Sequence, residues 1–371
     1  MFNSKLVDYQ KIWKRYIEIN MSRLETIYCK AHNNIYNDRG HLNYSKRDVR
    51  VELGIPDKGT NENTGLLILI PGYGGSIDSH VFKKMREEFC EEYNLVTMQC
   101  DYFGNRYMSA ENPIEVRKIF EINKIEKGYF IYKDDLGESI DEFNDMGIMQ
   151  ALDIVSSTLN ILFLLRDRKH IVNTKKIILF GVSHGAYVAH LANLICPNLF
   201  TYILDISAYI KPYYLDVIRA QFIKNERIEC QIVKEQFINN NPQYRYNEKL
   251  YDLDFLYSRT KNRCKIIALQ GTEDPMVKAQ EKVSFINGIE NAEIMLIGQE
   301  DVDGVLCKNA QHGLGLDFFE FFKIMMPLLE EIKRASSCEI NIPKEIVLGD
   351  DETHMIVNYR EGLPQLIDIT F

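Results

Sequence analysis

Several features that would assign this sequence to a particular class of protein are absent from it. No apolar run approaches the roughly 20 residues that a membrane-spanning helix needs, and the longest, such as Leu159–Leu165, have the length of core segments. The eight cysteines include no C-x-x-C pair and no cysteine–histidine cluster, so neither a disulfide framework nor a zinc site is expected. Buried thiols are the better interpretation, and we expect no membrane insertion and no bound metal.

Positive charge is also scarcer than negative charge. The chain has 44 Lys and Arg residues against 53 Asp and Glu residues, which gives a net charge of −9 at pH 7. A surface of that sign repels the phosphates of nucleic acids and anionic lipids, so neither is an expected partner. Residues 1–8 carry charges every few positions and no apolar segment, so no secretion signal is predicted and the expected location is the cytoplasm.

Apolar residues are plentiful, and their pattern predicts the fold class. They make up 46% of the 371 residues, and from residue 66 onwards short apolar runs alternate with helical periodicity. Leu66–Ile70, between Gly65 and Pro71, has the continuous apolar character of a parallel strand that is covered on both faces. The alternation predicts an α/β fold, a three-layer α/β/α sandwich around a mostly parallel sheet. The predicted strands are Val49–Leu53, Leu66–Ile70, Leu95–Gln99, Lys176–Phe180, Tyr202–Ile206, Lys265–Leu269 and Glu293–Ile297, and the predicted helices are Val81–Glu92, Met146–Leu165 (with Asn144 or Asp145 as its N-cap), Ala186–Leu194 and Phe318–Lys333.

This pattern defines a main domain over residues 48–335, with an extension at each end. In the N-terminal extension, residues 1–47, apolar side chains recur at three- and four-residue spacings as far as Ile27, which predicts an amphipathic helix. That helix is expected to pack on the main domain or on a second subunit of a homo-oligomer. The C-terminal extension, residues 336–371, contains two strand-like pieces that predict an appended hairpin. These pieces are Glu345–Leu348 and His354–Tyr359.

A nucleophile motif lies between a predicted strand and a predicted helix. Gly181-Val182-Ser183-His184-Gly185 is a G-x-S-x-G sequence, whose glycines leave room for a sharp turn from strand to helix. The N–H groups at the start of the following helix then point at Ser183 and favour negative charge there. A glycine-rich turn without catalysis is the alternative interpretation. Ser183 is the candidate nucleophile.

An acid and a base follow this serine in the order that such a turn requires. Serine, acid and histidine come in that order along chains with this motif. The predicted strand 265–269 leads into Gly-Thr-Glu-Asp, which ends at Asp274, and His312 lies in a loop just before the last predicted helix. In the predicted triad, Ser183 attacks, His312 takes and returns the proton, and Asp274 orients the imidazole.

Other residues compete for two of these roles. Asp205, at the end of the preceding predicted strand, is the alternative acid, although a turn-forming aspartate is the simpler interpretation. Glu273 is expected to face solvent. His184 is expected to contribute its backbone N–H, and His190 to lie on a helix face in the core. The remaining histidines have no matching position; they are His32, His41, His80, His170 and His354.

A glycine-rich loop before the predicted helix Val81–Glu92 is the last motif of the candidate site. Pro71-Gly72-Tyr73-Gly74-Gly75 ends the strand 66–70, and glycine lets such a loop approach the serine closely. The N–H groups of Tyr73 and His184 are the predicted oxyanion hole, with a simple tight turn as the alternative. The loop matches neither phosphate-binding pattern, so no nucleotide and no other cofactor is expected.

These four motifs, in this order, resemble the α/β-hydrolase superfamily over about residues 48–335. More narrowly, the run from Asn144 to Asp153 and the Ser-His-Gly-Ala-Tyr sequence resemble a bacterial family of unknown function. That family is loosely similar to prolyl-oligopeptidase-like hydrolases and to a sugar O-acetyltransferase component of accessory secretion, and its members are often associated with surface-glycan or flagellin-modification loci. The resemblance implies the α/β-hydrolase fold and the triad named above.

Two segments interrupt the alternation of strands and helices, about 102–143 and 207–263. The second lies where the α/β-hydrolase fold commonly carries a cap, and the first is expected to form another wall of the pocket. The rings of the cap suit recognition of a sugar or an acyl group, although they also suit simple packing of the cap on the main domain. The aromatic residues are Tyr209, Tyr213, Tyr214, Phe222, Phe237, Tyr244, Tyr246, Tyr251, Phe255 and Tyr257.

The predicted function is that of a serine hydrolase that works through an acyl-enzyme. An esterase, deacylase or acyltransferase acting on a small acylated substrate, such as a sugar, is favoured over a prolyl-oligopeptidase-like peptidase, because no propeller domain is predicted. A catalytically silent scaffold is the alternative from another class, but a scaffold would have no need of a complete Ser/Asp/His set.

Overall fold

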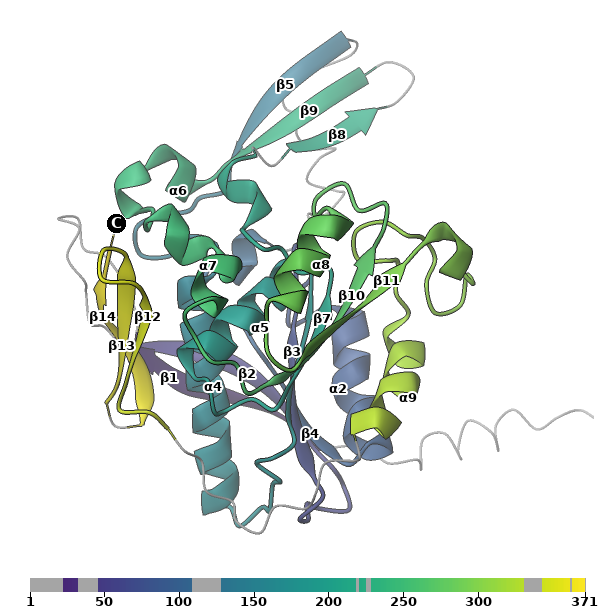
Figure 1. Cartoon of the computed structure of the whole chain (residues 1–371), viewed down its shortest axis with the longest axis vertical. Coiled ribbons are helices and arrows are strands. Elements are labelled where there is room, and N and C mark those ends of the chain that lie inside the picture. The colour runs from purple at the N-terminus through teal and green to yellow at the C-terminus, as the bar shows by residue number, and fades with distance from the viewer. Residues whose placement is uncertain are drawn as a thin grey trace, which may run out of the picture.

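The computed structural model describes residues 23–32, 46–108, 128–217, 220–224, 228–329, 342–360 and 362–370. At its centre is a sheet of eight strands, in the order β1-β2-β4-β3-β6-β7-β10-β11 (Figure 1). Every neighbouring pair from β4 to β11 is parallel, whereas β1 and β2 join the sheet antiparallel. The predicted α/β class and mostly parallel sheet are confirmed. The strands are β1 Arg23–His32, β2 Lys46–Ile55, β3 Gly65–Ile70, β4 Leu95–Cys100, β6 Ile177–Val182, β7 Tyr202–Ile206, β10 Lys265–Gly271 and β11 Ala292–Ile297.

Helices cover both faces of this sheet, because successive residues of its inner strands point to opposite sides and both sides are apolar. On β3, Leu67 and Leu69 belong to the core under α2 and α9. Leu66, Ile68 and Ile70 belong to the larger core under α4, α5 and α8 (Figure 1). The three-layer arrangement is therefore as predicted. The helices are α2 His80–Glu92, α4 Ile148–Asp167, α5 His184–Ile195, α8 Ala279–Asn287 and α9 Phe318–Leu329.

Helix α4 is long and apolar, and it belongs to the core. By length and composition its 20 residues could cross a membrane, and it is the one such helix in the described part of the chain. However, 83% of its apolar window is buried inside the fold, which is the burial of a core helix. The sequence placed this helix at Met146–Leu165, so its existence is confirmed and its bounds differ by two residues at each end.

The predicted N-terminal helix is wrong where the structure can test it. Residues 23–32 form strand β1, which pairs antiparallel with β2 at the edge of the central sheet. Cys29 and Ala31 are buried, whereas Tyr28 and Lys30 between them are exposed, and this period of two belongs to a strand with one covered face. The apolar side chains spaced three and four residues apart, which end at Ile27, overlap this alternation of buried and exposed residues at only a few positions. Residues 1–22 and 33–45 lie outside the described residues.

The two interrupting segments meet in a second, small sheet. Strand β5, Gly128–Asp135, comes from the first segment and pairs in parallel with β9, Ile228–Glu235, from the second. Strand β8, Ala220–Lys224, completes the order β5-β9-β8, and this sheet projects beyond the main body (Figure 1). The rest of the second segment returns to the body through short helices. These are α6 Phe237–Asn240 and α7 Leu253–Tyr257, with two 3-10 helices between them, Pro242–Tyr244 and Glu248–Tyr251.

The C-terminal residues form an antiparallel sheet of three strands where a two-stranded hairpin was predicted. The two predicted strands exist, and a third strand follows after a tight turn at Gly362, whose φ is +79°. The sheet is not a detached extension, because Leu348, Met355 and Val357 share one core with α4 and α5. Its strands are β12 Glu345–Gly349, β13 His354–Arg360 and β14 Leu363–Ile369.

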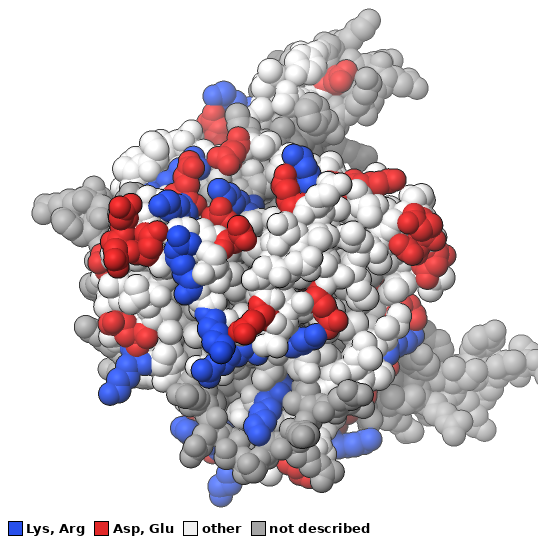
Figure 2. Space-filling view, viewed as in Figure 1, with Lys and Arg blue, Asp and Glu red and all other residues white. Residues whose placement is uncertain are grey.

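Charged side chains of both signs are interspersed on the face shown in Figure 2, beside a broad uncharged area on its right half. Some charged residues of the described part of the chain form pairs near the surface: Lys211 Nζ lies 3.0 Å from Asp252 Oδ2, and Arg50 Nη2 lies 2.9 Å from Asp78 Oδ1. Exposed pairs of this kind contribute little to stability.

Candidate active site

Ser183 lies on a strained turn between β6 and α5. Its φ of 57° and ψ of −122° are unfavourable for a residue with a side chain, and the turn presents the side chain outwards from the sheet. The glycines on either side of this turn are required because a side chain at either position would collide with neighbouring backbone. A Cβ on Gly181 would lie 2.5 Å from the backbone N of Ala186, and one on Gly185 would lie 2.1 Å from the carbonyl oxygen of Ile70. The local backbone is the one that the G-x-S-x-G motif predicts.

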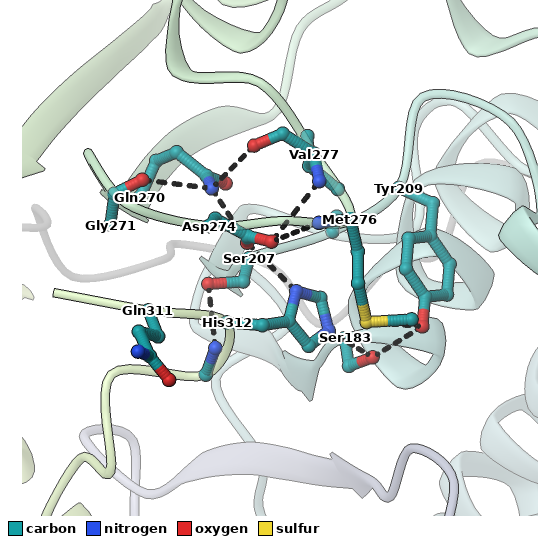
Figure 3. A network of polar contacts seen from close by, with 12 residues as sticks. Ser183, Ser207, Tyr209, Gln270, Gly271, Asp274, Met276, Val277, Gln311 and His312 are labelled. Carbon is teal, nitrogen blue, oxygen red and sulfur yellow. Dashed lines mark hydrogen bonds and ion pairs between the residues drawn. The ribbon is translucent and has the colours of Figure 1, made fainter. Parts of the chain in front are cut away.

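The structure brings the three predicted triad residues together (Figure 3). His312 Nε2 lies 2.7 Å from Ser183 Oγ, and His312 Nδ1 lies 2.8 Å from Asp274 Oδ2. Asp274 follows β10 and His312 follows β11, so both come from loops at the carboxyl edge of neighbouring parallel strands. The Asp274 side chain is fully buried, whereas that of His312 remains 18% exposed. A substrate can therefore reach the serine–histidine end of this chain of contacts.

The surroundings of Asp274 keep it ionised. Its Oδ1 accepts hydrogen bonds from the backbone N–H groups of Met276 and Val277, at 2.8 and 3.1 Å. Its Oδ2 accepts one from Gln270 Nε2 at 2.8 Å, in addition to that from His312. Burial raises the pKa of this carboxyl, but the hydrogen bond and charge of His312 outweigh burial, and the pKa lies below its usual value. A carboxylate here holds the proton of His312 on Nδ1 and leaves Nε2 to accept from Ser183.

Asp205, the alternative acid, lies in a different cluster. Its Oδ2 is 2.6 Å from Lys282 Nζ and 2.9 Å from His190 Nε2, and the side chains of all three residues are fully buried. Although burial acts in the opposite direction, the charge of Lys282 and the hydrogen bond of His190 hold the pKa of Asp205 below its usual range. Asp205 is thus the partner of a buried cation and not of His312. Glu273 is exposed, as expected.

The glycine-rich loop after β3 packs against the serine turn. A Cβ on Gly72 would lie 2.5 Å from the carbonyl oxygen of Val182 and 3.2 Å from Ser183 Cβ, so glycine permits this close approach. The rings of Tyr73 and His184 meet edge to face with centroids 5.3 Å apart. His184 is the first residue of α5, where a backbone N–H has no acceptor within the helix. The structure therefore brings together the two residues predicted to form the oxyanion hole.

A chain of buried side-chain hydrogen bonds links those two residues. His184 Nε2 lies 2.6 Å from Gln150 Oε1, and Gln150 Nε2 donates to Asn144 Oδ1 at 2.8 Å. Asn144 Nδ2 then donates to Tyr73 Oη at 2.6 Å. Burial lowers the pKa of His184 to about 3, so its ring is neutral and Nε2–H is the donor to Gln150. The sequence singled out the run from Asn144 to Asp153 but did not predict this link.

Tyr209, which follows β7, touches two of the triad residues. Its Oη lies 3.1 Å from Ser183 Oγ, and its ring is stacked on the imidazole of His312, with centroids 5.4 Å apart and planes 8° from parallel. The side chain is 2% exposed. The sequence placed Tyr209 only among the aromatic residues of the second segment, because nothing in the local pattern distinguishes it from its neighbours.

A cavity of about 520 Å³ adjoins the loop that holds Asp274, although none of the three triad residues lines it. Met276 and Val277, whose N–H groups bind Asp274, form part of its wall, and Ile210 and Tyr213 from the second segment form another part. Among the described residues, no group of three His, Cys, Asp or Glu side chains is arranged to hold a metal ion.

Comparisons with known proteins agree with this architecture. The family described as "Protein of unknown function (DUF2920)" matches residues 111–348, more than half of the chain. No curated protein matches the sequence.

Solved structures with this arrangement have low sequence identity to the chain. The uncomplexed acylaminoacyl peptidase of Pyrococcus horikoshii is 13% identical with a TM-score of 0.51, over 91% of this chain and 45% of that one. Dipeptidyl peptidase 4 of Porphyromonas gingivalis is 13% identical with a TM-score of 0.50, over 87% of this chain and 37% of that one. Est1E from Butyrivibrio proteoclasticus, bound to ferulic acid, is 14% identical with a TM-score of 0.42, over 76% and 93%. The chain thus has the α/β-hydrolase fold and spans less than half of the two peptidases.

Proposed function

Because the chain belongs to the DUF2920 family of proteins of unknown function and has the α/β-hydrolase fold, we propose from its geometry that it is a serine hydrolase. The observation that carries the proposal is the continuous chain of contacts from Ser183 Oγ through the His312 imidazole to the buried Asp274 carboxylate, at 2.7 and 2.8 Å. This geometry allows a proton to move from the serine to the histidine as the serine attacks.

The reaction has two halves. In the first, His312 Nε2 takes the proton of Ser183, Oγ bonds to the acyl carbon, and His312 then gives the proton to the departing group as its bond to that carbon breaks. In the second, His312 takes a proton from water or another hydroxyl, whose oxygen attacks the acyl-enzyme. The bond between the acyl carbon and Oγ breaks, and the proton returns to Ser183. Hydrolysis and acyl transfer differ only in the nucleophile of this second half.

The backbone N–H groups of Tyr73 and His184 are proposed to stabilise the oxyanion in both halves. The close packing of Gly72 on the serine turn supports this role, since it brings the loop close both to Ser183 and to the backbone N of His184. Donors that are fixed before the reaction need not be reorganised as charge develops. The buried links through Gln150 and Asn144 fix the side chains of both residues.

The proposed substrate is a small acylated molecule such as an acylated sugar. Three partly exposed tyrosine rings continue from the buried Tyr209 beside Ser183: Tyr213 stacks on Tyr209, Tyr214 meets Tyr213 edge to face, and Tyr73 meets Tyr214 edge to face. Phenol rings offer apolar faces to a sugar ring and hydroxyl groups to its edges. A slot for a long acyl chain would instead be lined mainly by aliphatic side chains.

Labelling with a fluorophosphonate probe tests the enzymatic proposal directly, because the probe reacts only with an activated serine. We expect stoichiometric labelling of the purified protein at Ser183, identified by peptide mass spectrometry. Ser183→Ala should abolish both labelling and cleavage of p-nitrophenyl acetate, with turnover lower by about 10⁴–10⁶-fold. Ser258→Ala, at an exposed serine on the end of α7, is the matched control and should behave as the wild type.

An unlabelled wild-type protein, or a Ser183→Ala variant with most of the original rate, would remove the basis for a serine hydrolase. In that case the catalytically silent scaffold would be the better description.

The substrate class is tested by a series of acyl groups. We expect faster turnover with acetyl than with butyryl or octanoyl p-nitrophenyl esters, and release of acetate from acetylated amino sugars. Acetyl-peptide nitroanilides serve as the comparison for peptidase activity. A preference for octanoyl esters, with no acetate released from any sugar, would contradict the proposed substrate while leaving the mechanism intact.

A further inference from the structure

We propose that Tyr209 is a further catalytic residue, whose hydroxyl donates a hydrogen bond to Ser183 Oγ and stabilises that oxygen as the acyl-enzyme is broken down. The inference rests on the proposed acyl-enzyme mechanism and goes beyond it, because it assigns the second half of the reaction to a residue outside the triad.

The position of Tyr209 is fixed from two sides (Figure 3). Its hydroxyl lies 3.1 Å from Ser183 Oγ and 4.0 Å from Met276 Sδ, and its ring lies almost parallel to that of His312. The backbone turns sharply just before it at Ser207, where φ is 56°. Such a turn after β7 directs the following residues over the carboxyl edge of the sheet, where the triad lies. Tyr209 is thus held against the reacting atoms by packing and backbone together.

Counting hydrogens assigns the donor in this contact. Ser183 has a single hydroxyl hydrogen, and His312 Nε2 at 2.7 Å is a shorter contact than Tyr209 Oη at 3.1 Å. When that hydrogen lies on the bond to His312, the serine oxygen can only accept. The phenol hydrogen has one other acceptor within reach, Met276 Sδ at 4.0 Å, and because a thioether is a weak acceptor the phenol then donates to Ser183 Oγ. Burial raises the pKa of the Tyr209 phenol far above its ordinary value, so the group keeps its proton through the reaction.

The second half of the reaction depends on this donor more than the first half does. In the free enzyme, the Ser183 hydroxyl oxygen already accepts the phenol hydrogen, so the bond only strengthens as Oγ attacks. In the acyl-enzyme, Oγ is the bridging oxygen of an ester, which is a poor acceptor. When the bond between the acyl carbon and Oγ breaks, its electron pair goes to Oγ before His312 returns the proton. A hydrogen bond to a charged oxygen is roughly twice as strong as one between neutral groups.

Removing only the hydroxyl therefore changes the ratio of the two rates. For Tyr209→Phe we expect fluorophosphonate labelling, which reports attack by Ser183, to stay within about threefold of the wild-type rate. Breakdown of the acetyl-enzyme should slow by about tenfold or more, in line with the loss of one charge-assisted hydrogen bond. The acetyl-enzyme should then accumulate, giving a burst of p-nitrophenol close to one equivalent and an acetylated protein visible by intact mass spectrometry.

Two further variants separate the hydroxyl from the ring. Replacement of Tyr209 by 3-fluorotyrosine keeps the shape and makes the phenol a stronger donor, so breakdown of the acetyl-enzyme should be faster than in Tyr209→Phe and no slower than in the wild type. Tyr209→Leu removes the ring that stacks on His312, so labelling should slow as well. Tyr257→Phe is the matched control, because it removes another buried phenol hydroxyl, 3.0 Å from His190 Nδ1, away from the triad.

The inference is overturned if Tyr209→Phe slows labelling and acetyl-enzyme breakdown equally, or slows neither. Either result would leave Tyr209 as a packing residue while the triad stands, provided that the wild type is labelled at Ser183. Failure to label the wild type would overturn the proposed function itself, and the role of Tyr209 with it.

Discussion

Two buried aspartates lie at the ends of neighbouring parallel strands, and their partners separate their roles. Asp274 receives only N–H donors and the imidazole of His312, so it orients a histidine that must change its charge during the proposed reaction. Asp205 instead binds the ammonium group of Lys282, which is fully buried. A carboxylate that pairs with a buried ammonium group is needed for stability, because an unpaired cation is costly to keep out of water.

This difference predicts opposite defects for two matched substitutions. Asp274→Asn should lower kcat by about 10²–10⁴-fold with little loss of stability, because the amide no longer fixes the tautomer of His312. Asp205→Asn should lower the free energy of unfolding by about 3–5 kcal/mol, because Lys282 is left unpaired, while the turnover per folded molecule stays near the wild-type value. Urea unfolding and active-site titration measure the two quantities. A larger catalytic defect in Asp205→Asn would reverse the assignment of the acid.

The residues of the triad could be predicted from the sequence because order and local context identify them. A serine between two glycines needs a turn of one shape, and the acid and histidine follow at the ends of predicted strands. Tyr209, Gln150 and Lys282 carry no such local mark. Each acts through a contact with a residue distant in the sequence, and a tyrosine, a glutamine or a lysine is common in any surface segment. Contacts of this kind are visible only after the chain has folded.

At the scale of elements, the beginning of α4 shows how a helix start and a buried acid are connected. Asp145 Oδ2 accepts a hydrogen bond from the N–H of Met149 at 2.6 Å, and Oδ1 accepts one from Gly147 at 3.2 Å. The sequence predicted Asn144 or Asp145 as the N-cap, but the N-cap is Gly147, because the helix begins two residues later than predicted. Asp145 still reaches the first turn through Met149, whereas Asn144 Oδ1 accepts from Met146, before the helix, at 3.1 Å. Burial raises the pKa of Asp145 to about 7, against the opposing effect of these N–H donors.

The raised pKa of Asp145 predicts a pH-dependent stability. Between about pH 4 and pH 7 the folded protein holds this proton while the unfolded chain has released it. The stabilisation that the bound proton gives the folded state is therefore full below about pH 4, decreases as the pH rises, and is lost once the pH has passed 7. Asp145→Asn resembles the protonated acid in shape and in its lack of charge. It should raise the melting temperature less at pH 5 than at pH 8, as measured by calorimetry. An equal shift at both pH values would contradict a proton on Asp145.

Elements with a clear apolar run or stripe could be predicted, whereas those in which a buried polar residue interrupts the stripe, or whose apolar residues face solvent, could not. The inner strands have continuous apolar runs, so their positions are confirmed within a residue or two. Helix α8 was missed because Lys282 occupies one of its buried positions and hides the apolar stripe next to Phe285 and Ile286. Strand β5 was missed because it stands in a small projecting sheet, where Tyr129 and Ile131 are exposed and its partner strand is about a hundred residues away.

At the scale of the whole molecule, the C-terminal sheet is joined to the main body at several points. Tyr359 Oη donates to the carbonyl oxygen of Ile195, the last residue of α5, at 2.7 Å. The N–H of Asn247, in the second interrupting segment, donates to the carbonyl oxygen of Thr370 at 3.0 Å. Since this sheet also shares a core with α4, we expect one cooperative unfolding unit instead of a body and a separate tail.

Tyr359→Phe tests this cooperativity. Loss of the hydroxyl leaves the carbonyl of Ile195 without that donor, so stability should fall by about 1–3 kcal/mol. The whole calorimetric transition should move to lower temperature as a single peak. Separation of a small early transition, with the main peak unmoved, would show that the C-terminal sheet unfolds by itself.

The small projecting sheet limits which parts of this gene can be exchanged by recombination with a related gene. Its middle strand, β9, pairs with β8 from the same segment and with β5 from the other, and the carboxylate of Glu138, just after β5, accepts from the N–H of Phe237 just after β9 at 2.6 Å. A recombination that replaced residues 207–263 alone would leave β5 with an unmatched edge and Glu138 without that donor. The two stretches of the gene lie on either side of the codon for Ser183. We therefore expect a stable recombinant to carry both stretches from the same parent.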